Sequence, residues 1–95
     1  MALTVIVAYD VANNRRRTRL ANYLQGWGYR MQESVFQLRL SNEELSEVCA
    51  RIDKLISETD DVVHVYLLCA ACCGRAEVFG TAPALDDVGL YSGVW

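Results

Sequence analysis

The residues best suited to chemistry lie where an apolar run gives way to charge. Asp10 ends the run LTVIVAYD, residues 3–10, and a four-residue loop separates it from three consecutive arginines. A carboxylate can help to hold Mg²⁺, which takes one or two such ligands together with water and substrate phosphates. Two interpretations of Asp10 remain open: a metal ligand, or a solvated turn residue that caps the following helix. The residue types alone favour the second.

Four arginines fall within five positions: Arg15, Arg16, Arg17 and Arg19. A guanidinium group can bind a phosphate through two parallel hydrogen bonds. At the start of a helix these arginines add positive charge to the positive end of the helix dipole, which costs stability. The pattern therefore favours binding of an anionic ligand over ordinary solvated charge. Contacts of this kind give affinity and position but not sequence specificity.

Other reactive residues have simpler explanations. Tyr9 and Phe36 are able to stack on nucleic-acid bases, but packing in a core or interface is the favoured interpretation. His64 lies within an apolar run and is expected to be an ordinary surface or edge histidine. Ser34 has no neighbouring base in the sequence and is not predicted to be a nucleophile.

The cysteines Cys69, Cys72 and Cys73 form the pattern C-x-x-C-C. One C-x-x-C supplies two zinc ligands, whereas a structural zinc site normally has four. A second subunit or Cys49 would have to complete such a site, and ordinary buried thiols are favoured instead. A thioredoxin-like role is disfavoured because the motif is expected to end a strand rather than to open a helix.

Length and charge limit the class of protein. A chain of 95 residues with 53% hydrophobic residues forms one domain with a modest core, and a dimer would add buried area. Residues 1–40 hold six arginines against two acids, whereas residues 41–95 carry net negative charge. A basic half indicates an anionic partner. No signal peptide or membrane-spanning run is visible, so we expect a cytoplasmic location and reduced thiols.

Hydrophobic periodicity predicts the elements that position these residues. Ser41 with Glu44 forms a capping-box pattern at the start of the second helix. Gly26 and Gly28 are expected to end the first helix, one of them in the left-handed conformation. The remaining expectations are a strand over 3–10, a helix over 15–25, strand pairing over 29–40 with a break at 32–34, a helix to about Glu58, a strand over 62–70, a tight turn at 72–74 and a short strand over 76–79.

This order predicts an α+β fold, a ferredoxin-like βαββαβ sandwich with a C-terminal strand or hairpin arm. The proposed domain covers residues 1–80, and residues 81–95 form an arm expected to dock on the sheet of its own or a partner subunit. Two helices would cover one face of the sheet and leave the other free. With so many hydrophobic residues, that free face is expected to pack against a second copy.

Several of these features together resemble a known family. They are Tyr9-Asp10 after an apolar strand, an arginine-rich helix start, Gly28, Arg30, Gln32 and Ser34-Val35-Phe36. The combination is similar to the CRISPR-associated adaptation proteins of the Cas-two family, over about Leu3 to Gly80. The stretch VHVYLLCAACCGRAEVFG also resembles the last core strands of that family, whereas the tail after Gly80 matches less well.

The resemblance implies a ferredoxin-like homodimer that joins an integrase partner in CRISPR spacer acquisition and holds duplex DNA. It also implies metal-dependent nuclease activity of the kind described for several members, on RNA or duplex DNA, with Mg²⁺ or Mn²⁺ as cofactor. The family's catalytic and metal-binding Asp corresponds to Asp10. Nucleic-acid-binding positions correspond to Tyr9, Arg17, Arg19, Arg30 and Phe36, with Arg15 and Arg16 as added candidates.

One carboxylate per chain is sparse for a nuclease, so the sequence supports metal binding better than cleavage. The competing interpretation is a non-catalytic ferredoxin-like regulatory or binding domain that dimerises through its sheet.

Overall fold

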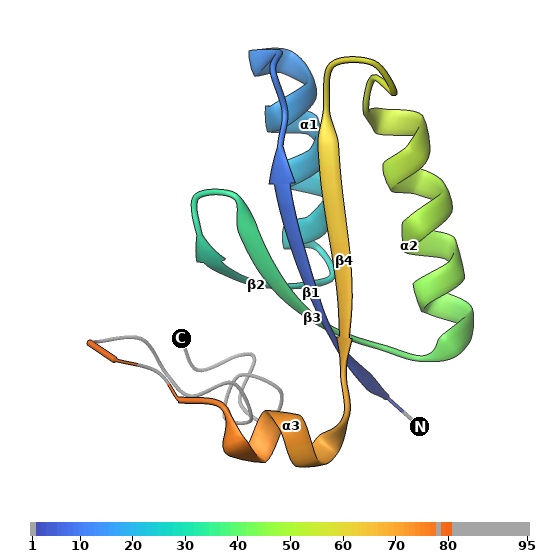
Figure 1. Ribbon diagram of the computed structural model, residues 1–95. Coiled ribbons are helices and arrows are strands. Elements are labelled where there is room, and N and C mark those ends of the chain that lie inside the picture. Colours follow the sequence, from blue (N-terminus) through green and yellow to red (C-terminus); the bar gives the residue numbers. More distant parts are fainter. Residues whose placement is uncertain (1, 78, 81–95) are drawn as a thin grey trace.

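An antiparallel four-stranded sheet covered on one face by two helices forms the molecule, whose computed structural model describes residues 2–77, 79 and 80 (Figure 1). The strand order is β2-β3-β1-β4, which makes β1 a central strand. The expected α+β, ferredoxin-like βαββαβ fold is therefore confirmed. The elements are β1 (Leu3–Asp10), α1 (Asn14–Gln25), β2 (Gly28–Gln32), β3 (Val35–Leu40), α2 (Asn42–Leu55), β4 (Val62–Leu68) and α3 (Ala70–Arg75).

Both long helices begin at side-chain caps. Asn13 accepts a hydrogen bond from the Arg16 backbone N–H at 3.0 Å, and Ser41 with Glu44 forms the predicted reciprocal capping box. The second helix ends at Leu55, earlier than the predicted Glu58. The chain turns there because the Ser57 N–H donates to the Asp61 carboxylate at 2.8 Å instead of continuing the helix.

The expectation that Gly26 or Gly28 takes the left-handed conformation is wrong. Gly26 has φ −72°, and Gly28 is not among the described glycines with positive φ. Close approach explains Gly28 instead. A Cβ atom built there would lie 2.2 Å from the Gln37 carbonyl oxygen and 2.9 Å from the Leu38 Cα. Glycine thus lets β2 lie against β3 at this register, in which Gly28 pairs with Leu38.

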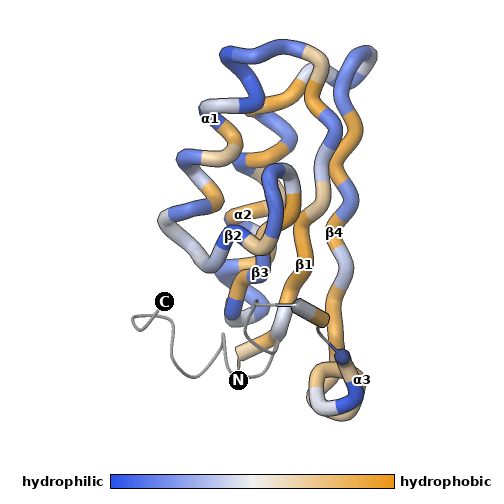
Figure 2. The backbone as a smooth tube through the Cα atoms, turned by 90° about the vertical axis from the view of Figure 1, so that its left-hand side faces the viewer, coloured by the Kyte–Doolittle hydropathy of each residue, from blue (hydrophilic) through white to orange (hydrophobic). Residues whose placement is uncertain are grey.

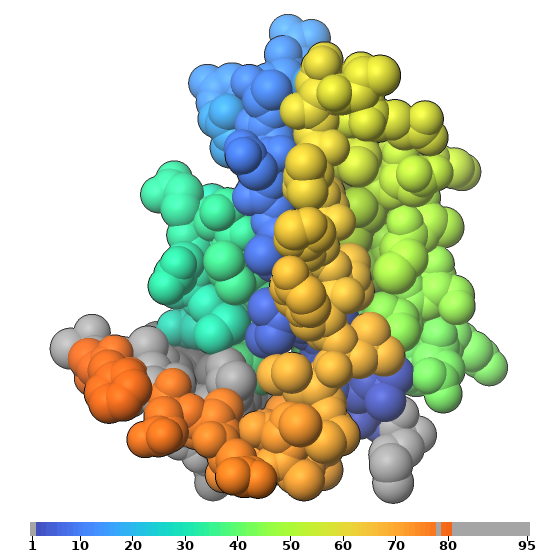
Figure 3. Space-filling model, in the orientation of Figure 1, coloured from blue at the N-terminus to red at the C-terminus, as the bar shows by residue number. Residues whose placement is uncertain are grey.

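The core lies between the sheet and the helices (Figure 2). Val5 and Val7 of β1 are fully buried on the helix-facing side, whereas Ile6 and Ala8 on the opposite side are only half-buried. The uncovered sheet face expected from the order of the elements is therefore present. Figure 3 looks onto this second face, where β4 also exposes Val62 and Tyr66 by 51% and 52%. No helix of the described residues is long and apolar enough to cross a membrane.

The end of the described chain differs from expectation. The sequence predicts a turn at residues 72–74, but α3 begins directly after Cys69 and packs Cys73 inward. Residues 76, 77 and 79, where a short strand is predicted, are not in a strand. The predicted arm over residues 81–95 lies outside the residues that the structure describes.

Candidate nucleic-acid interface

Asp10 lies exposed at the carboxyl end of β1, opposite Val62 of β4. The chain passes from Asp10 through residues 11–13 directly into α1, so the carboxylate and the start of that helix share one end of the sheet (Figure 1). Asp10 also lines an open hollow of about 210 Å³ together with Ala8, Tyr9, Val62 and His64. The predicted junction of an acid with a basic helix start is therefore present.

The arginine cluster divides into structural and free members. Arg16 forms an ion pair with Asp61, with 2.8 Å between its Nε and the carboxylate Oδ2, and its Nη2 donates to Oδ1 at 3.2 Å. Arg17 donates through Nε and Nη2 to the Val11 carbonyl oxygen, at 3.1 and 2.9 Å. Both arginines thus hold the loop between β1 and α1 in place, a role that the charge pattern does not reveal.

Asp61 is the centre of that arrangement. Its side chain has no exposed surface and also accepts hydrogen bonds from the N–H groups of Ala12, at 3.0 Å, and Ser57, at 2.8 Å. The Arg16 hydrogen bond is the main reason that the pKa of the Asp61 carboxyl lies well below its usual range. Asp61 is not singled out by the sequence analysis. Its partner lies 45 positions away, a separation over which local pattern gives no signal.

Arg15 and Arg19 remain free to bind a ligand. They lie one helical turn apart on α1, both are exposed, and neither side chain has a hydrogen bond or ion pair within the described residues. Two unpaired guanidinium groups on one exposed helix face, next to Asp10 in the chain, suit the spaced phosphates of a nucleic-acid backbone.

Tyr9, Arg30 and Phe36 converge on the turn between β2 and β3. The Tyr9 hydroxyl donates to the Glu33 carbonyl oxygen at 3.2 Å, and the same oxygen accepts from Arg30 Nε at 3.1 Å. Burial raises the pKa of Tyr9. Phe36 is fully buried, 6.3 Å from the Tyr9 ring and 5.5 Å beneath the Arg30 guanidinium carbon. These contacts match the favoured interpretation of Tyr9 and Phe36 as packing residues. The Arg30 side chain, in contrast, is exposed.

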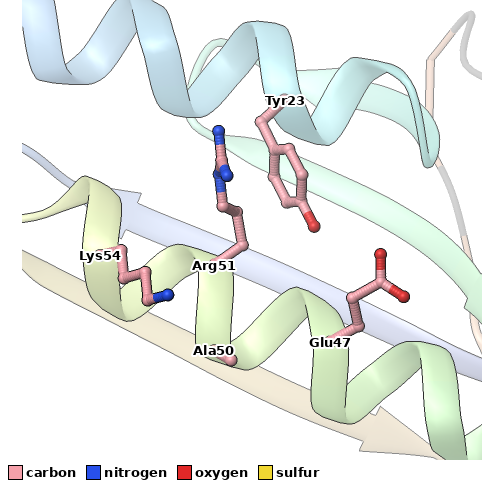
Figure 4. A pocket seen from close by; sticks show the side chains of 5 residues that line it. All are labelled: Tyr23, Glu47, Ala50, Arg51 and Lys54. Atoms are coloured by element: carbon pink, nitrogen blue, oxygen red, sulfur yellow. The ribbon is translucent and has the colours of Figure 1, made fainter.

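Two features of the surface went unforeseen. An open pocket of about 280 Å³ lies between α1 and α2, where the Arg51 guanidinium carbon is 5.7 Å from the centre of the Tyr23 ring (Figure 4). Its remaining lining residues are Glu47, Ala50 and Lys54.

The cysteines also differ from expectation, because Cys49, Cys69 and Cys72 are exposed and only Cys73 is a buried thiol. His64 is an exposed histidine as predicted, with its Nδ1 3.2 Å from the Tyr66 hydroxyl.

Comparison with known proteins identifies the family. A model of the family described as CRISPR associated protein Cas2 matches residues 2–76, most of the chain. The chain belongs to the Cas2 family. It is 40% identical over 73 residues to a protein of Thermus thermophilus named CRISPR-associated endoribonuclease Cas2, a match that covers 77% of this chain and 78% of the relative.

Solved structures of Cas2 proteins have the same fold. The crystal structure of Streptococcus pyogenes Cas2 at pH 6.5 superposes with a TM-score of 0.71 at 30% identity, over 81% of this chain and 99% of that one. A chain from a partial Cas6-RT-Cas1–Cas2 complex also shares the fold, with a TM-score of 0.69 at 18% identity over 80% and 89% of the two chains. The family predicted from Tyr9-Asp10 and the arginine-rich helix is thus confirmed.

Proposed function

We propose that this Cas2-family chain is the DNA-holding subunit of a CRISPR spacer-acquisition complex. It acts as a homodimer and holds duplex DNA together with a Cas1-like integrase partner. The observation that carries the proposal is that Arg15 and Arg19, exposed on the helix that follows Asp10, have no hydrogen bond or ion pair within the described residues. One chain of the partial Cas6-RT-Cas1–Cas2 complex shares this fold, and the name of that complex supports the choice of partner.

The open face of the sheet supports the dimer. Half-buried Ile6 and Ala8 lie beside the exposed edge strand β4, which presents Val62 and Tyr66 (Figure 3). Apolar side chains on an uncovered sheet face gain free energy when a second copy removes them from water. A dimer built on this face would bring two copies of the hollow beside Asp10 into one assembly.

Nuclease activity is a second candidate function, favoured by the exposure of Asp10 in that hollow. The described residues contain no group of three or more side chains that could hold a metal ion, so they do not by themselves build a closed metal site. One carboxylate does fit a Mg²⁺ or Mn²⁺ ion that keeps several waters and takes phosphate oxygens from the substrate, with Asp10 of a second copy completing the set. Such an ion would activate water for attack on a phosphodiester bond. Within the chain, Asp10 would position the ion, and Arg15 and Arg19 would position the nucleic-acid backbone. The relative named an endoribonuclease supports cleavage as a candidate activity.

Salt-dependent binding to duplex DNA tests the main proposal. Replacement of Arg15 and Arg19 together by Ala removes two phosphate contacts per chain, and the slope of log affinity against log salt should fall by about 0.9 for each. The matched control replaces Arg39 and Arg75 by Ala, because both are exposed and lie at the far end of the sheet. It removes the same charge and should leave the slope unchanged. Equal losses in both double variants would show that binding depends on net charge alone.

The competing non-catalytic interpretation, a regulatory domain that binds no nucleic acid, predicts no salt-dependent binding in any variant. Cleavage is tested separately with Asp10→Asn, which should retain DNA binding and lose metal-dependent cutting of RNA or duplex DNA. If the variant cuts as fast as the unmodified protein, Asp10 does not position the metal.

A further inference from the structure

Two cysteines at the junction between β4 and α3 lie in direct contact. Cys69 is the N-cap of α3, and its Sγ accepts a hydrogen bond from the Cys72 backbone N–H at 3.3 Å. The Cys72 Sγ lies 3.2 Å from the Cys69 Sγ, and both side chains are exposed. The C-x-x-C segment therefore does open a helix, contrary to the expectation from its sequence, and it presents both thiols to solvent.

This geometry is close to that of a disulfide. A disulfide bond is about 2.05 Å long, so the two sulfurs need to approach by only about 1 Å, within a single turn of backbone. The third thiol is not a competitor, because Cys73 is buried. Zinc would need four ligands, and the described residues provide no cluster of three.

We propose that Cys69 and Cys72 are a redox-active pair that exchanges between a dithiol and an intramolecular disulfide by reaction with small-molecule disulfides. This site lies outside the nucleic-acid interface and does not depend on it.

The two thiols have different roles in the exchange. The contact between the two thiols and the backbone N–H bond to its Sγ lower the pKa of Cys69, whereas the contact between the thiols raises the pKa of Cys72. Cys69 is therefore the attacking thiolate and Cys72 the resolving thiol.

The reaction balances in two steps. The Cys69 thiolate attacks one sulfur of a small disulfide, which forms a mixed disulfide and releases one small thiolate. Cys72 then loses its proton and attacks the Cys69 Sγ, which forms the Cys69–Cys72 bond and releases the second small thiolate. The protein loses two electrons and two protons, and the small disulfide is reduced to two thiols.

Oxidation would change the connection between β4 and α3. The sulfur contact that now caps α3 becomes a covalent bond between the N-cap and the first turn of the helix. The turn that directs the chain away from the sheet edge (Figure 1) would then be unable to unwind.

The pair is tested on the full chain, reduced and then equilibrated with glutathione disulfide, alkylated and analysed by peptide mass spectrometry. The unmodified protein should show a single peptide in which Cys69 and Cys72 have lost two hydrogens and resist alkylation. Cys72→Ser should instead keep glutathione on Cys69. In this variant the backbone N–H bond to the Cys69 Sγ remains and still favours the thiolate, so Cys69 should react with glutathione disulfide faster than the exposed thiol of Cys49 does.

Two variants serve as controls. Cys49→Ser removes an exposed thiol from α2, which contributes nothing to the pair, and should behave as the unmodified protein. Cys69→Ser retains a good N-cap, so α3 should form, as circular dichroism can check, and Cys72 should react slowly.

Three results would overturn the proposal. The first is disulfides that mainly link two chains through Cys49. The second is equal rates of modification at Cys69 and Cys72 in the two single variants. The third is protection of both thiols by added zinc that only a chelator reverses, which would assign the pair to metal binding.

Discussion

Replacement of Gly28 by Ala tests the account of how β2 and β3 meet. The added Cβ would lie 2.2 Å from the Gln37 carbonyl oxygen and 2.9 Å from the Leu38 Cα, both backbone atoms that no side-chain rotation can move. Ordinary contact begins near 3.4 Å, so the two strands must separate by about 1.2 Å at this point. Overpacking of this kind costs about 1–3 kcal/mol.

The consequence can be measured by thermal or urea denaturation. For a domain of this size, each kcal/mol lowers Tm by about 4–8 °C. Because β2 leads to the turn at Glu33, which Tyr9 and Arg30 both hold, amide exchange should also become faster across that turn.

Gly26→Ala is the matched control. It lies two residues earlier, has φ −72°, and would place its Cβ 3.5 Å from the Tyr23 carbonyl oxygen, an ordinary contact. This substitution should be neutral or stabilise by up to about 1 kcal/mol, because alanine restricts the unfolded chain. Equal stability of the Gly28→Ala protein and the unmodified protein would refute the close-approach argument.

Three further predictions concern the charge pair, the core and the metal. The pKa of Asp61 is lowered in the folded state, so its contribution to the free energy of unfolding is present at neutral pH and is lost as pH falls below about 4. Asp61→Asn should therefore lower the free energy of unfolding at pH 7. It should also make that free energy depend less on pH in the acid range. Leu38→Ala, at a fully buried position, should cost about 2–5 kcal/mol by urea denaturation, and a loss under 1 kcal/mol would contradict the assigned core. Addition of Mg²⁺ should shift the NMR resonances around Asp10 in the unmodified protein but not in Asp10→Asn, and identical shifts in both would place the ion elsewhere.

Features set by neighbours in the chain were predictable. The capping box of Ser41 and Glu44 formed as expected because both partners lie within one turn of helix. The exposed face shared by Arg15 and Arg19 followed from their four-residue spacing. The family resemblance depended on local patterns of the same kind, around Asp10 and the residues after Gly28.

Features set by distant contacts were not predictable. Arg16 and Arg19 are the same residue type on the same helix, yet Arg16 pairs with Asp61, 45 residues away, whereas Arg19 has no partner within the part of the chain that the structure describes. The helix after Cys69 was missed because its glycine and cysteines are weak helix formers. Its N-cap sulfur and the inward packing of Cys73 favour helix there, and neither is a periodic signal.

The central position of β1 has a consequence for synthesis on the ribosome. The first strand to emerge needs both neighbours, β3 and the much later β4, and until β4 is made one edge of β1 keeps unpaired N–H and C=O groups. Asp61 emerges just before β4, so the ion pair between Arg16 and Asp61 cannot form until then either. A nascent chain arrested before residue 61 would therefore lack both the closing strand and the charge pair, and would present an open edge to chaperones or to other unfinished chains.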